Sequence, residues 1–479
     1  MRRLTTAFVG ICGATALVAG TIGHAQPRAI SQNERAQGDQ VHPQLLRQYG
    51  GAYGGPQAAY VSRVGKRIAV QSGLSNSERD FQVTLLNSPV NNAFAIPGGY
   101  VYVTRQLLAL MNDEAELAAV LGHEIGHVAA RHSRSRSRTS TGTSLLATLL
   151  GAVTGSSAVG QLAGQVGQLY TLRFSRKQEI QSDDLGVSYL SGAGYDPLAM
   201  SSVLASLADQ NRLDQSSSGP GGSAPEWAST HPDPASRVLR ARQRAQQVGR
   251  MGGERNRDAF LAAIDGMIYG DDPRQGVIDG RSFRHPDLRI AFTAPLGYTL
   301  SNSPDAVLIT GRGGQAQLST LPFRGDLADY VDRAFTALSQ SGRAPAPAVQ
   351  RTRVNGMEAA YATTRASTGR QAVDATVFAI ATSRDNAYHF LLVTPAGQGI
   401  GPFGPLIDSF RALSPGEASQ VRTRVIDVRT VRPGDTPERL AQDMAYEDLK
   451  LQRFLVLNGF SGNAALRAGE KVKLVVWRR

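Results

Sequence analysis

The spacing of apolar residues divides the chain into a helical first half and a mixed second half. In the first half, apolar positions recur at helical intervals, and two short alternating segments are typical of strands. Helices are expected over 57–72, 113–130 and 173–193, then on to about 211, and from the segment 229–237 to about 248. Strands are expected over 81–86 and 100–104, with a further strand before the turn at 97–99. Residues 26–250 are therefore predicted to form a mainly α-helical domain with a small β-sheet.

The second half of the chain changes to short strands and few helices. Residues 251–282 read as a glycine-rich linker with a short helix. Strands, one helix and a hairpin predict an α+β domain over 283–415, with no catalytic constellation in its sequence. Residues 420–479 follow the order strand, helix, helix, strand and predict a small βααβ domain. The expected fold class is therefore multidomain.

The first 25 residues have the pattern of a secretory signal peptide. Arg2 and Arg3 precede an uncharged apolar run over 4–22, and residues 23–25 (GHA) offer a cleavage site between small residues. A membrane anchor is the alternative interpretation of such a run. We expect an exported protein located in the periplasm.

Cysteine content and charge restrict the classes of site and partner. Cys12 is the only cysteine and lies within the predicted signal, so a metal site in the mature chain must use histidine, aspartate or glutamate. The formal net charge of +12 favours contact with anionic lipid surfaces, cell-wall polymer or acidic proteins. Because export separates the chain from nucleic acid, we expect no nucleic-acid partner.

The segment HEIGH, residues 123–127, has the spacing of a metal site on a helix. Residues four apart share one helix face, so the imidazoles of His123 and His127 can reach one ion. Glu124 projects beside them, where it can take a proton from water. The alternative is a helix that carries two histidines and an acid by chance. A catalytic metal needs a third protein ligand, so other segments decide between them.

The candidates for the third ligand are His132, His231 and the acids of SRKQEIQSDDLG, residues 175–186. Glu179 lies on a separate predicted helix, and Asp183 follows four residues later on the same face. We predict that Glu179 binds the metal and that Asp183 accepts a hydrogen bond from a ligand histidine. The alternative is that these acids form a solvated helix face.

Four segments in a fixed order resemble a family of zinc peptidases. They are NNAFAIPGGYVYVTRQLL (91–108), NDEAELAAVLGHEIGHVAARH (112–132), SRKQEIQSDDLG (175–186) and THPDPASR (230–237). Residues from about 40 to 245 thereby resemble the family that includes HtpX and the CAAX prenyl proteases, especially its exported branch of β-barrel-assembly-enhancing proteases. One departure is Ser182, where the family usually has alanine. The fold implied is a zincin-type peptidase domain.

The resemblance implies a ligand set and a mechanism. One zinc ion per chain would be held by His123, His127 and Glu179, with Glu124 as general base and acid. His231 would face the metal or the tetrahedral oxyanion, as a second catalytic candidate, and Arg237 would lie nearby. These assignments make the chain a metalloendopeptidase.

The resemblance also implies how substrate binds. The residues Asn92, Ala93, Phe94 and Ala95 correspond to the edge strand against which the family lays extended substrate. Backbone pairing reads the conformation of a chain more than its side chains. Unfolded or stalled envelope proteins are therefore the expected substrates.

The C-terminal segment 420–479 resembles a LysM module. The match rests on VRTVRPGDTPERLAQDM (428–444), FLVLNG (454–459) and LRAGEKVKLV (466–475). It implies binding to peptidoglycan glycans. The leading hypothesis is an exported zinc metalloendopeptidase for envelope protein quality control. The alternatives are an envelope chaperone or assembly factor with secondary proteolysis, and a peptidoglycan hydrolase. The uncharged segment 139–170 is expected to cover the site, touch membrane or pack in the core.

Overall fold

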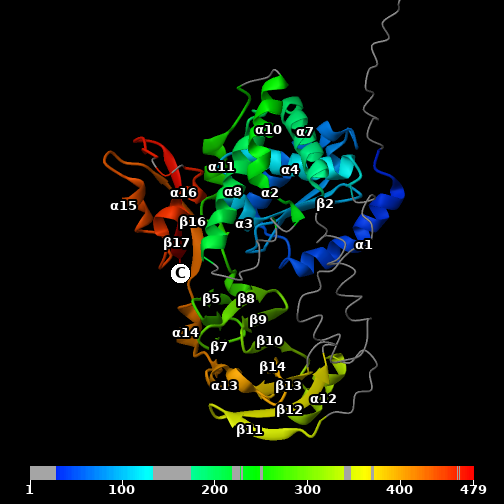
Figure 1. Cartoon of the computed structure of the whole chain (residues 1–479), viewed down its shortest axis with the longest axis vertical. Helices are drawn as coiled ribbons and strands as arrows, with labels where there is room; N and C mark the ends of the chain where they lie inside the picture. The colour runs from blue at the N-terminus through cyan, green and yellow to red at the C-terminus, as the bar shows by residue number, and fades with distance from the viewer. Residues whose placement is uncertain are drawn as a thin grey trace, which may run out of the picture.

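A computed structural model describes most of the chain, and Figure 1 shows its arrangement. The described residues are 29–132, 174–217, 227, 230–248, 252–338, 347–367, 372–460, 462 and 464–478. The predicted signal peptide, 1–25, and the segment 139–170 lie outside them. Among the described residues, no helix combines the length and apolar character needed to cross a membrane. The protein contains helices and several sheets, as expected for a peptidase domain followed by a β-rich domain.

The first half of the chain folds into helices around a small sheet. The predicted helices over 57–72, 113–130 and 173–193 are confirmed, with ends that differ by a few residues. The elements are α1 (Gln32–Gln48), α2 (Gly55–Ala69), β1 (Gln82–Leu86), β2 (Ala93–Ile96), β3 (Tyr100–Thr104), α3 (Arg105–Leu110), α4 (Glu114–Ala129), α7 (Arg176–Gly192), α8 (Ala199–Ser217) and α10 (Pro234–Gln247).

Helix α4 is the central element of this half. It begins at Asp113, whose side chain accepts a hydrogen bond from the backbone N–H of Glu116 at 2.9 Å, as an N-cap residue does. Every residue from Glu114 to His127 is buried, because α2, α7, α8 and β2 surround the helix. A helix enclosed on all sides holds its polar side chains in fixed positions, which a metal site requires.

The small sheet has the order β1-β3-β2, which leaves β2 at an edge. Strands β1 and β3 are parallel, while β2 and β3 form an antiparallel hairpin with Phe94 opposite Tyr102. The hairpin turns through Gly98 and Gly99, both with positive φ; a Cβ on Gly99 would lie 2.3 Å from the carbonyl oxygen of Asp80. Only glycine fits this turn, which holds β2 against α4.

The middle of the chain forms two packed antiparallel sheets and one covering helix. A seven-stranded sheet has the order β11-β12-β13-β14-β10-β9-β8, and a four-stranded sheet has the order β15-β7-β6-β5. One hydrophobic core includes residues of both sheets, and a second lies between the larger sheet and α12. The elements are β5 (Val277–Asp279), β6 (Ser282–His285), β7 (Ile290–Thr293), β8 (Thr299–Ser303), β9 (Ala306–Gly311), β10 (Gly314–Thr320), α12 (Leu327–Leu338), β11 (Gln350–Val354), β12 (Met357–Ser367), β13 (Ala372–Ala381), β14 (Ala387–Pro395), α13 (Gly404–Asp408) and β15 (Arg411–Ala412).

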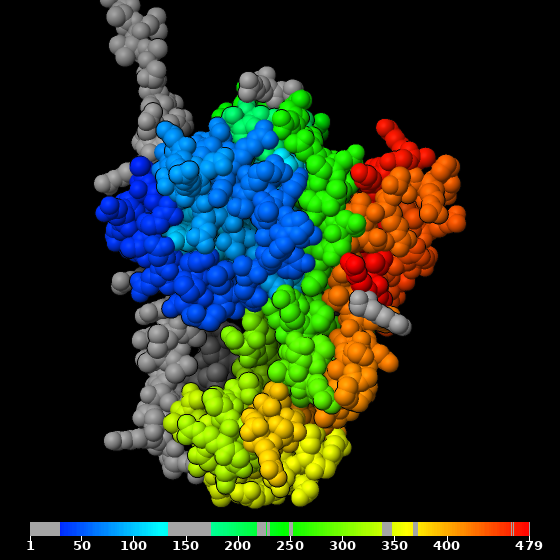
Figure 2. Space-filling model, turned by 180° about the vertical axis from the view of Figure 1, so that it is seen from behind, coloured from blue at the N-terminus to red at the C-terminus, as the bar shows by residue number. Residues whose placement is uncertain are grey.

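The C-terminal residues follow the predicted order strand, helix, helix, strand, after the short helix α14 (Pro415–Ser419). The elements are β16 (Thr423–Thr430), α15 (Pro437–Ala441), α16 (Lys450–Leu457) and β17 (Lys471–Arg478), with β16 and β17 antiparallel. Within the predicted linker lie α11 (Arg257–Ile264) and β4 (Ile268–Tyr269), and β4 pairs with β16. Figure 2 shows the orange and red C-terminal residues lying directly against the green ones.

One hydrophobic core joins the C-terminal residues to the first half of the chain. Phe454, Leu474 and Val475 belong to the same cluster of buried side chains as Leu121 of α4 and Phe260 of α11. The C-terminal segment is therefore packed into the first domain instead of being attached by a free tether.

Lys473 of β17 crosses this boundary. Its buried ammonium group donates hydrogen bonds to the backbone carbonyls of Ala109, at 2.8 Å, and Met111, just before α4. We expect Lys473→Ala to lower the free energy of unfolding by about 2–4 kcal/mol, because it leaves a cavity and two unpaired carbonyls. Chemical denaturation measures this change. Lys471→Ala, at a more exposed position of the same strand, is the control and should change stability by less than about 1 kcal/mol. Equal effects of the two substitutions would contradict the assignment.

Candidate metal centre

Three glycines allow α4 and α7 to approach closely. A Cβ on Gly126 would lie 3.2 Å from the carbonyl oxygen of Ser182, and one on Gly186 would lie 3.2 Å from the backbone nitrogen of His123. Gly122 faces Gly186 directly, with 3.6 Å between its ideal Cβ and the opposite Cα. Small residues at such a crossing bring two helices into backbone contact. Side chains from α4 and α7 can therefore meet at one point.

Four buried side chains converge at that point. His123, His127, Glu179 and His231 each offer one ligand atom, and these atoms all lie within 4.8 Å of one another. His123 Nε2 lies 3.0 Å from His127 Nε2 and 3.3 Å from His231 Nδ1. The Glu179 carboxylate lies 3.1 Å from His231 Nδ1 and 3.4 Å from His127 Nε2.

This donor set fits a bound zinc ion. Nitrogen and carboxylate ligands in a small buried cluster are what zinc takes in proteins that lack a cysteine ligand. Burial holds the pKa of His127 well below its usual value, so the neutral ring has a lone pair to give. Burial opposes ionisation of Glu179, but the attraction of His231, His127 and His123 outweighs it and sets the pKa of that carboxyl well below its usual range.

Asp183 and Arg237 position two of these ligands. Asp183 Oδ1 lies 2.9 Å from His123 Nδ1, which leaves His123 Nε2 facing the cluster. The guanidinium of Arg237 binds both Asp183 oxygens, at 2.7 and 2.8 Å, and also pairs with Glu179. Burial raises the pKa of Asp183, but Arg237 and His123 lower it further than burial raises it, so the carboxylate is ionised.

His132 has a position that the sequence did not reveal. Considered above as a third ligand, it lies behind His127 instead, with 2.9 Å between the Nδ1 atoms of the two rings. Its Nε2 lies 3.1 Å from Gln181 Oε1. His132 therefore orients His127 as Asp183 orients His123. The chain turns at Arg131, whose φ is 56°, just after the end of α4, and this turn places His132 beside His127.

Two aromatic side chains complete the walls of the site. Trp227 stacks on His231 with ring centroids 4.2 Å apart, and Phe174 stacks on His127 with centroids 3.6 Å apart. Neither residue was predicted, because a single aromatic residue outside a periodic segment carries no signal of its own.

Glu124 lies beside the cluster but outside the group of ligand atoms. Its side chain is 2% exposed, and Oε1 makes no hydrogen bond to any residue that the structure describes. The imidazole of His231 lies nearby, with its Nε2 3.5 Å from Glu124 Oε1. Burial raises the pKa of Glu124 despite the attraction of His231 and His123. A buried carboxylate with a free oxygen and a raised pKa is suited to accepting a proton.

The predicted site residues are therefore found together. His123, His127 and Glu179 converge, with His231 in the same group. Asp183 and Arg237 contact the ligands from behind, and β2, which carries the predicted substrate strand, packs against α4. Asn92 is buried and bound to Thr104 and Tyr49, so its side chain serves the fold of the hairpin.

The candidate metal centre lies within a segment of the chain that matches a known protein family. A model of peptidase family M48 matches residues 56–245, which contain α4, α7 and α10 and every metal-ligand candidate. Residues 56–245 form a peptidase family M48 domain. The assignment agrees with the resemblance that the sequence motifs carry.

Curated relatives match the same part of the chain. The chain is 34% identical over 212 residues to the Beta-barrel assembly-enhancing protease of Escherichia coli K12, covering 42% of each protein. It is 35% identical over 199 residues to the protein of that name from Yersinia pestis, covering 40% of this chain and 39% of the relative. It is 34% identical over 184 residues to the Mitochondrial metalloendopeptidase OMA1 of Schizosaccharomyces pombe, covering 38% of this chain and 51% of the relative. The chain thus spans about two fifths to one half of the relatives that it matches.

Replacement of Asp183, which contacts the ring of His123, tests the candidate metal site. We expect Asp183→Asn to weaken zinc binding by about 10–100-fold, because an amide is a poorer acceptor for His123 and leaves Arg237 with one carboxylate partner. Titration with a competing chelator measures the affinity. Asp184→Asn is the matched control, since Asp184 is the next residue of α7 and pairs with the exposed Arg240. Equal affinities of the two variants would contradict the role of Asp183.

Proposed function

We propose that the chain is a zinc-dependent metalloendopeptidase that hydrolyses peptide bonds of misfolded or stalled envelope proteins. The observation that carries the proposal is the convergence of His123, His127 and Glu179 beside the free carboxylate oxygen of Glu124, within an M48 domain. When bound there, one zinc ion would polarise both a water molecule and the peptide carbonyl.

Three residues of the chain have separate roles in the reaction: Glu124 transfers protons, His231 stabilises negative charge, and Arg237 positions two carboxylates. Glu124 takes the proton of the attacking water at its free Oε1 and later gives a proton to the leaving amine. His231, with Nε2 facing Glu124 at 3.5 Å, stabilises the oxyanion of the tetrahedral intermediate. Arg237 keeps Glu179 and Asp183 ionised and in place.

Substrate binds in extended form along β2. Ala93–Ile96 make backbone hydrogen bonds to β3 on one side, and no described segment other than β3 pairs with them. An edge strand of this kind can accept an extended peptide as an added strand. Folded proteins offer no such segment, which supports unfolded or stalled chains as substrates.

The strand-addition proposal predicts a dependence on the substrate backbone. A peptide N-methylated at two alternate residues of the paired segment should be cut about 10–100-fold more slowly, because two main-chain hydrogen bonds are lost. Shifting both methyl groups by one residue turns them away from β2 and provides the control. Quantified cleavage of both peptides by the mature protein measures the effect; equal slowing by both patterns would rule out pairing along β2.

Location and partners follow from the sequence features at the two ends of the chain. We propose export to the periplasm on the basis of residues 1–25, and contact with peptidoglycan through a LysM-like module at 420–479. The strand, helix, helix, strand order of that segment supports the module. The basic charge supports peripheral contact with anionic surfaces.

Metal content and chelation test the proposed activity. We expect about one zinc per chain of purified mature protein. Cleavage of casein, an unfolded protein, should stop on removal of the metal and return with added zinc. Glu179→Gln should lose both zinc and cleavage. Retention of zinc by that variant would contradict the ligand set. Zinc binding without cleavage of any unfolded protein would instead favour the chaperone alternative.

A further inference from the structure

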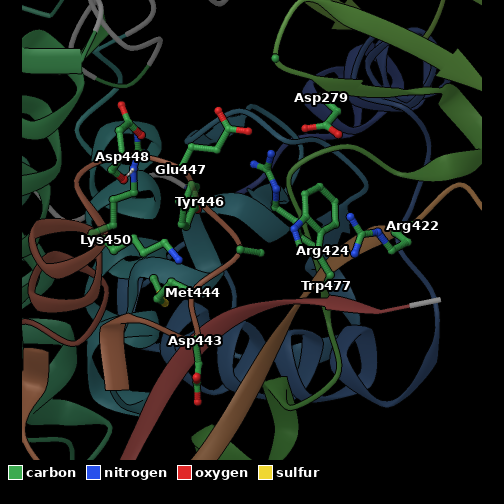
Figure 3. Close-up of a pocket in the computed structure, with 13 residues that line it drawn as sticks. Asp279, Arg422, Arg424, Asp443, Met444, Tyr446, Glu447, Asp448, Lys450 and Trp477 are labelled. Carbon is green, nitrogen blue, oxygen red and sulfur yellow. Dashed lines mark hydrogen bonds and ion pairs between the residues drawn. The ribbon is translucent and has the colours of Figure 1, made fainter. Parts of the chain in front are cut away.

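A pocket beside the C-terminal segment shares no residue with the candidate metal centre. The proposed peptidase activity therefore does not explain it. It is an open cavity of about 550 Å³ formed by the start of β16, the end of β17, the loop between α15 and α16, and the end of β5. Small-molecule sites in proteins occupy about 300–1,000 Å³. Figure 3 shows the carboxylates of Asp279 and Glu447 on the upper side, with Trp477, Arg422 and Arg424 below them.

Guanidinium groups and aromatic rings alternate along the pocket. The guanidinium carbons of Arg422 and Arg424 lie 4.9 and 4.8 Å from the ring centroid of Trp477. Those of Arg424 and Arg453 lie 5.2 and 4.5 Å from the ring centroid of Tyr446. Arg424 thus contacts both rings. Contact with an aromatic face fixes the position of a guanidinium group while its N–H donors stay directed outward in the plane.

Two of these guanidinium groups are available to a ligand. The side chains of Arg422 and Arg424 make no hydrogen bond or ion pair to another residue that the structure describes, and Arg424 Nε is buried without a partner. The third, Arg453, is bound to Asp448 at 3.2 Å. Unpaired guanidinium groups held in place are a ready receptor for a carboxylate, which they bind through two parallel hydrogen bonds.

Two carboxylates of the pocket are equally available. Asp443 is paired with Arg429, and Asp448 with Arg453. Asp279 and Glu447 have no ion pair among the described residues, and both are exposed to the cavity. Arg422 and Arg424 are therefore the unpaired cations of the pocket and Asp279 and Glu447 its unpaired anions, while Lys450, also in the lining, donates a hydrogen bond to the carbonyl oxygen of Gln442 at 2.8 Å. This arrangement is complementary to a ligand with one carboxylate and one ammonium group.

Other ligand chemistries fit this lining less well. A neutral sugar would stack on the aromatic rings, but it would compete there with the guanidinium groups that already contact Trp477 and Tyr446. A phosphate dianion would meet the four carboxylates of the lining: Asp279, Asp443, Glu447 and Asp448. We propose that the pocket binds the charged ends of a short peptide, with its carboxylate on Arg422 and Arg424 and its ammonium group on Asp279 and Glu447.

Calorimetric titration of the full mature chain with trialanine tests this proposal. Every sample carries Glu124→Gln so that no probe is cut, which also makes the result independent of the proposed peptidase activity. Arg422→Gln/Arg424→Gln should weaken trialanine binding at least about tenfold, through loss of charge-assisted hydrogen bonds. Trialanine amide, which lacks the carboxylate, should bind as weakly to the parent protein. Asp279→Asn/Glu447→Gln should weaken binding of trialanine and leave that of N-acetyl-trialanine unchanged.

The controls separate the site from general charge effects and from misfolding. Arg432→Gln/Arg439→Gln removes the same two charges at exposed positions outside the pocket, and should bind trialanine like the parent. Arg422→Lys/Arg424→Lys keeps the charge but loses the planar fork, and should also weaken binding. If the double glutamine variant has a lowered thermal midpoint, the single Arg422→Gln at an exposed position takes its place.

Several outcomes would overturn the proposal. Unchanged binding in the Arg422→Gln variants would place trialanine elsewhere on the chain. Binding of inorganic phosphate or of an N-acetylglucosamine trimer, without binding of trialanine, would assign the pocket to a different ligand class. No binding of any probe would leave the alternating stack with a purely structural role.

Discussion

Glu124→Gln is expected to reduce cleavage of unfolded protein by about 10²–10⁴-fold while the zinc content of the chain stays unchanged. The two halves of this expectation have separate structural reasons. Glu124 lies outside the group of atoms that can hold the ion, so an amide in its place removes no ligand. The amide has the shape of the carboxylate but cannot accept a proton, so the attacking water loses its base.

The buried position of Glu124 makes this substitution a clean test. Its Oε1 has no hydrogen-bond partner among the described residues, so the amide breaks no described hydrogen bond at that atom. Replacing a carboxylate with a raised pKa by a neutral group should also leave folding intact. Cleavage of a fluorogenic unfolded substrate measures the rate, and elemental analysis measures zinc.

Two further variants serve as controls for the effect of Glu124→Gln on zinc content and cleavage. Glu179→Gln should lose both metal and activity, whereas Asp184→Asn, on the outer face of the same helix, should keep both. A Glu124→Gln protein that cuts at the wild-type rate would refute Glu124 as the base. Loss of zinc together with activity would instead assign Glu124 to the ligand set.

Removal of residues 423–479 should unfold the M48 domain. The C-terminal segment contributes β16 and β17 to a sheet that includes β4, and it shares a hydrophobic core with α4 and α11. Its loss uncovers one side of the group formed by Phe260, Leu261, Ile264 and Met267, which are at most 1% exposed and also pack against α2 and α4. Full exposure of these side chains, at about 1.5–3 kcal/mol each, costs about 6–12 kcal/mol, so even half of it is a large share of the stability of a domain at about 5–15 kcal/mol.

An internal deletion is the matched control for this truncation. Residues 283–412 contribute most of two other hydrophobic cores, which are separate from that of the M48 domain. Ser282 lies opposite Thr293 of β7, whereas Leu413 lies beside Arg289 at the other end of that strand, so the two ends are about 10 Å apart across the sheet and about 13 Å apart along it. A glycine–serine linker of about ten residues spans this separation. This variant should keep the M48 domain folded.

Circular dichroism and resistance to a test protease compare the two deletions. Loss of the cooperative thermal transition is expected for the truncation only. A folded, zinc-binding protein ending at residue 422 would refute the dependence on the shared core. It would support the separate small domain that the sequence predicts at 420–479.

Local features of the sequence determined the positions of several helices and the choice of candidate metal ligands. The 3.6-residue period placed α2, α4 and α7, and the four-residue spacing of His123 and His127 required a common face. Because Cys12 is the only cysteine, the chain beyond residue 12 offers only histidine and carboxylate side chains as metal ligands, which directed attention to Glu179 and Asp183. These inferences needed no tertiary structure, because helix period and ligand chemistry depend on residues close together in the chain or on composition.

Tertiary structure decided what meets across long separations. Asp183 reaches His123 because α7 packs against α4, and Arg237 reaches Asp183 and Glu179 because α10 packs against α7. The C-terminal segment, predicted as a separate module, became part of the first core because β4 pairs with β16 and Lys473 reaches the carbonyl of Ala109. Periodicity tells which face of an element is apolar, but only packing decides which distant face it meets.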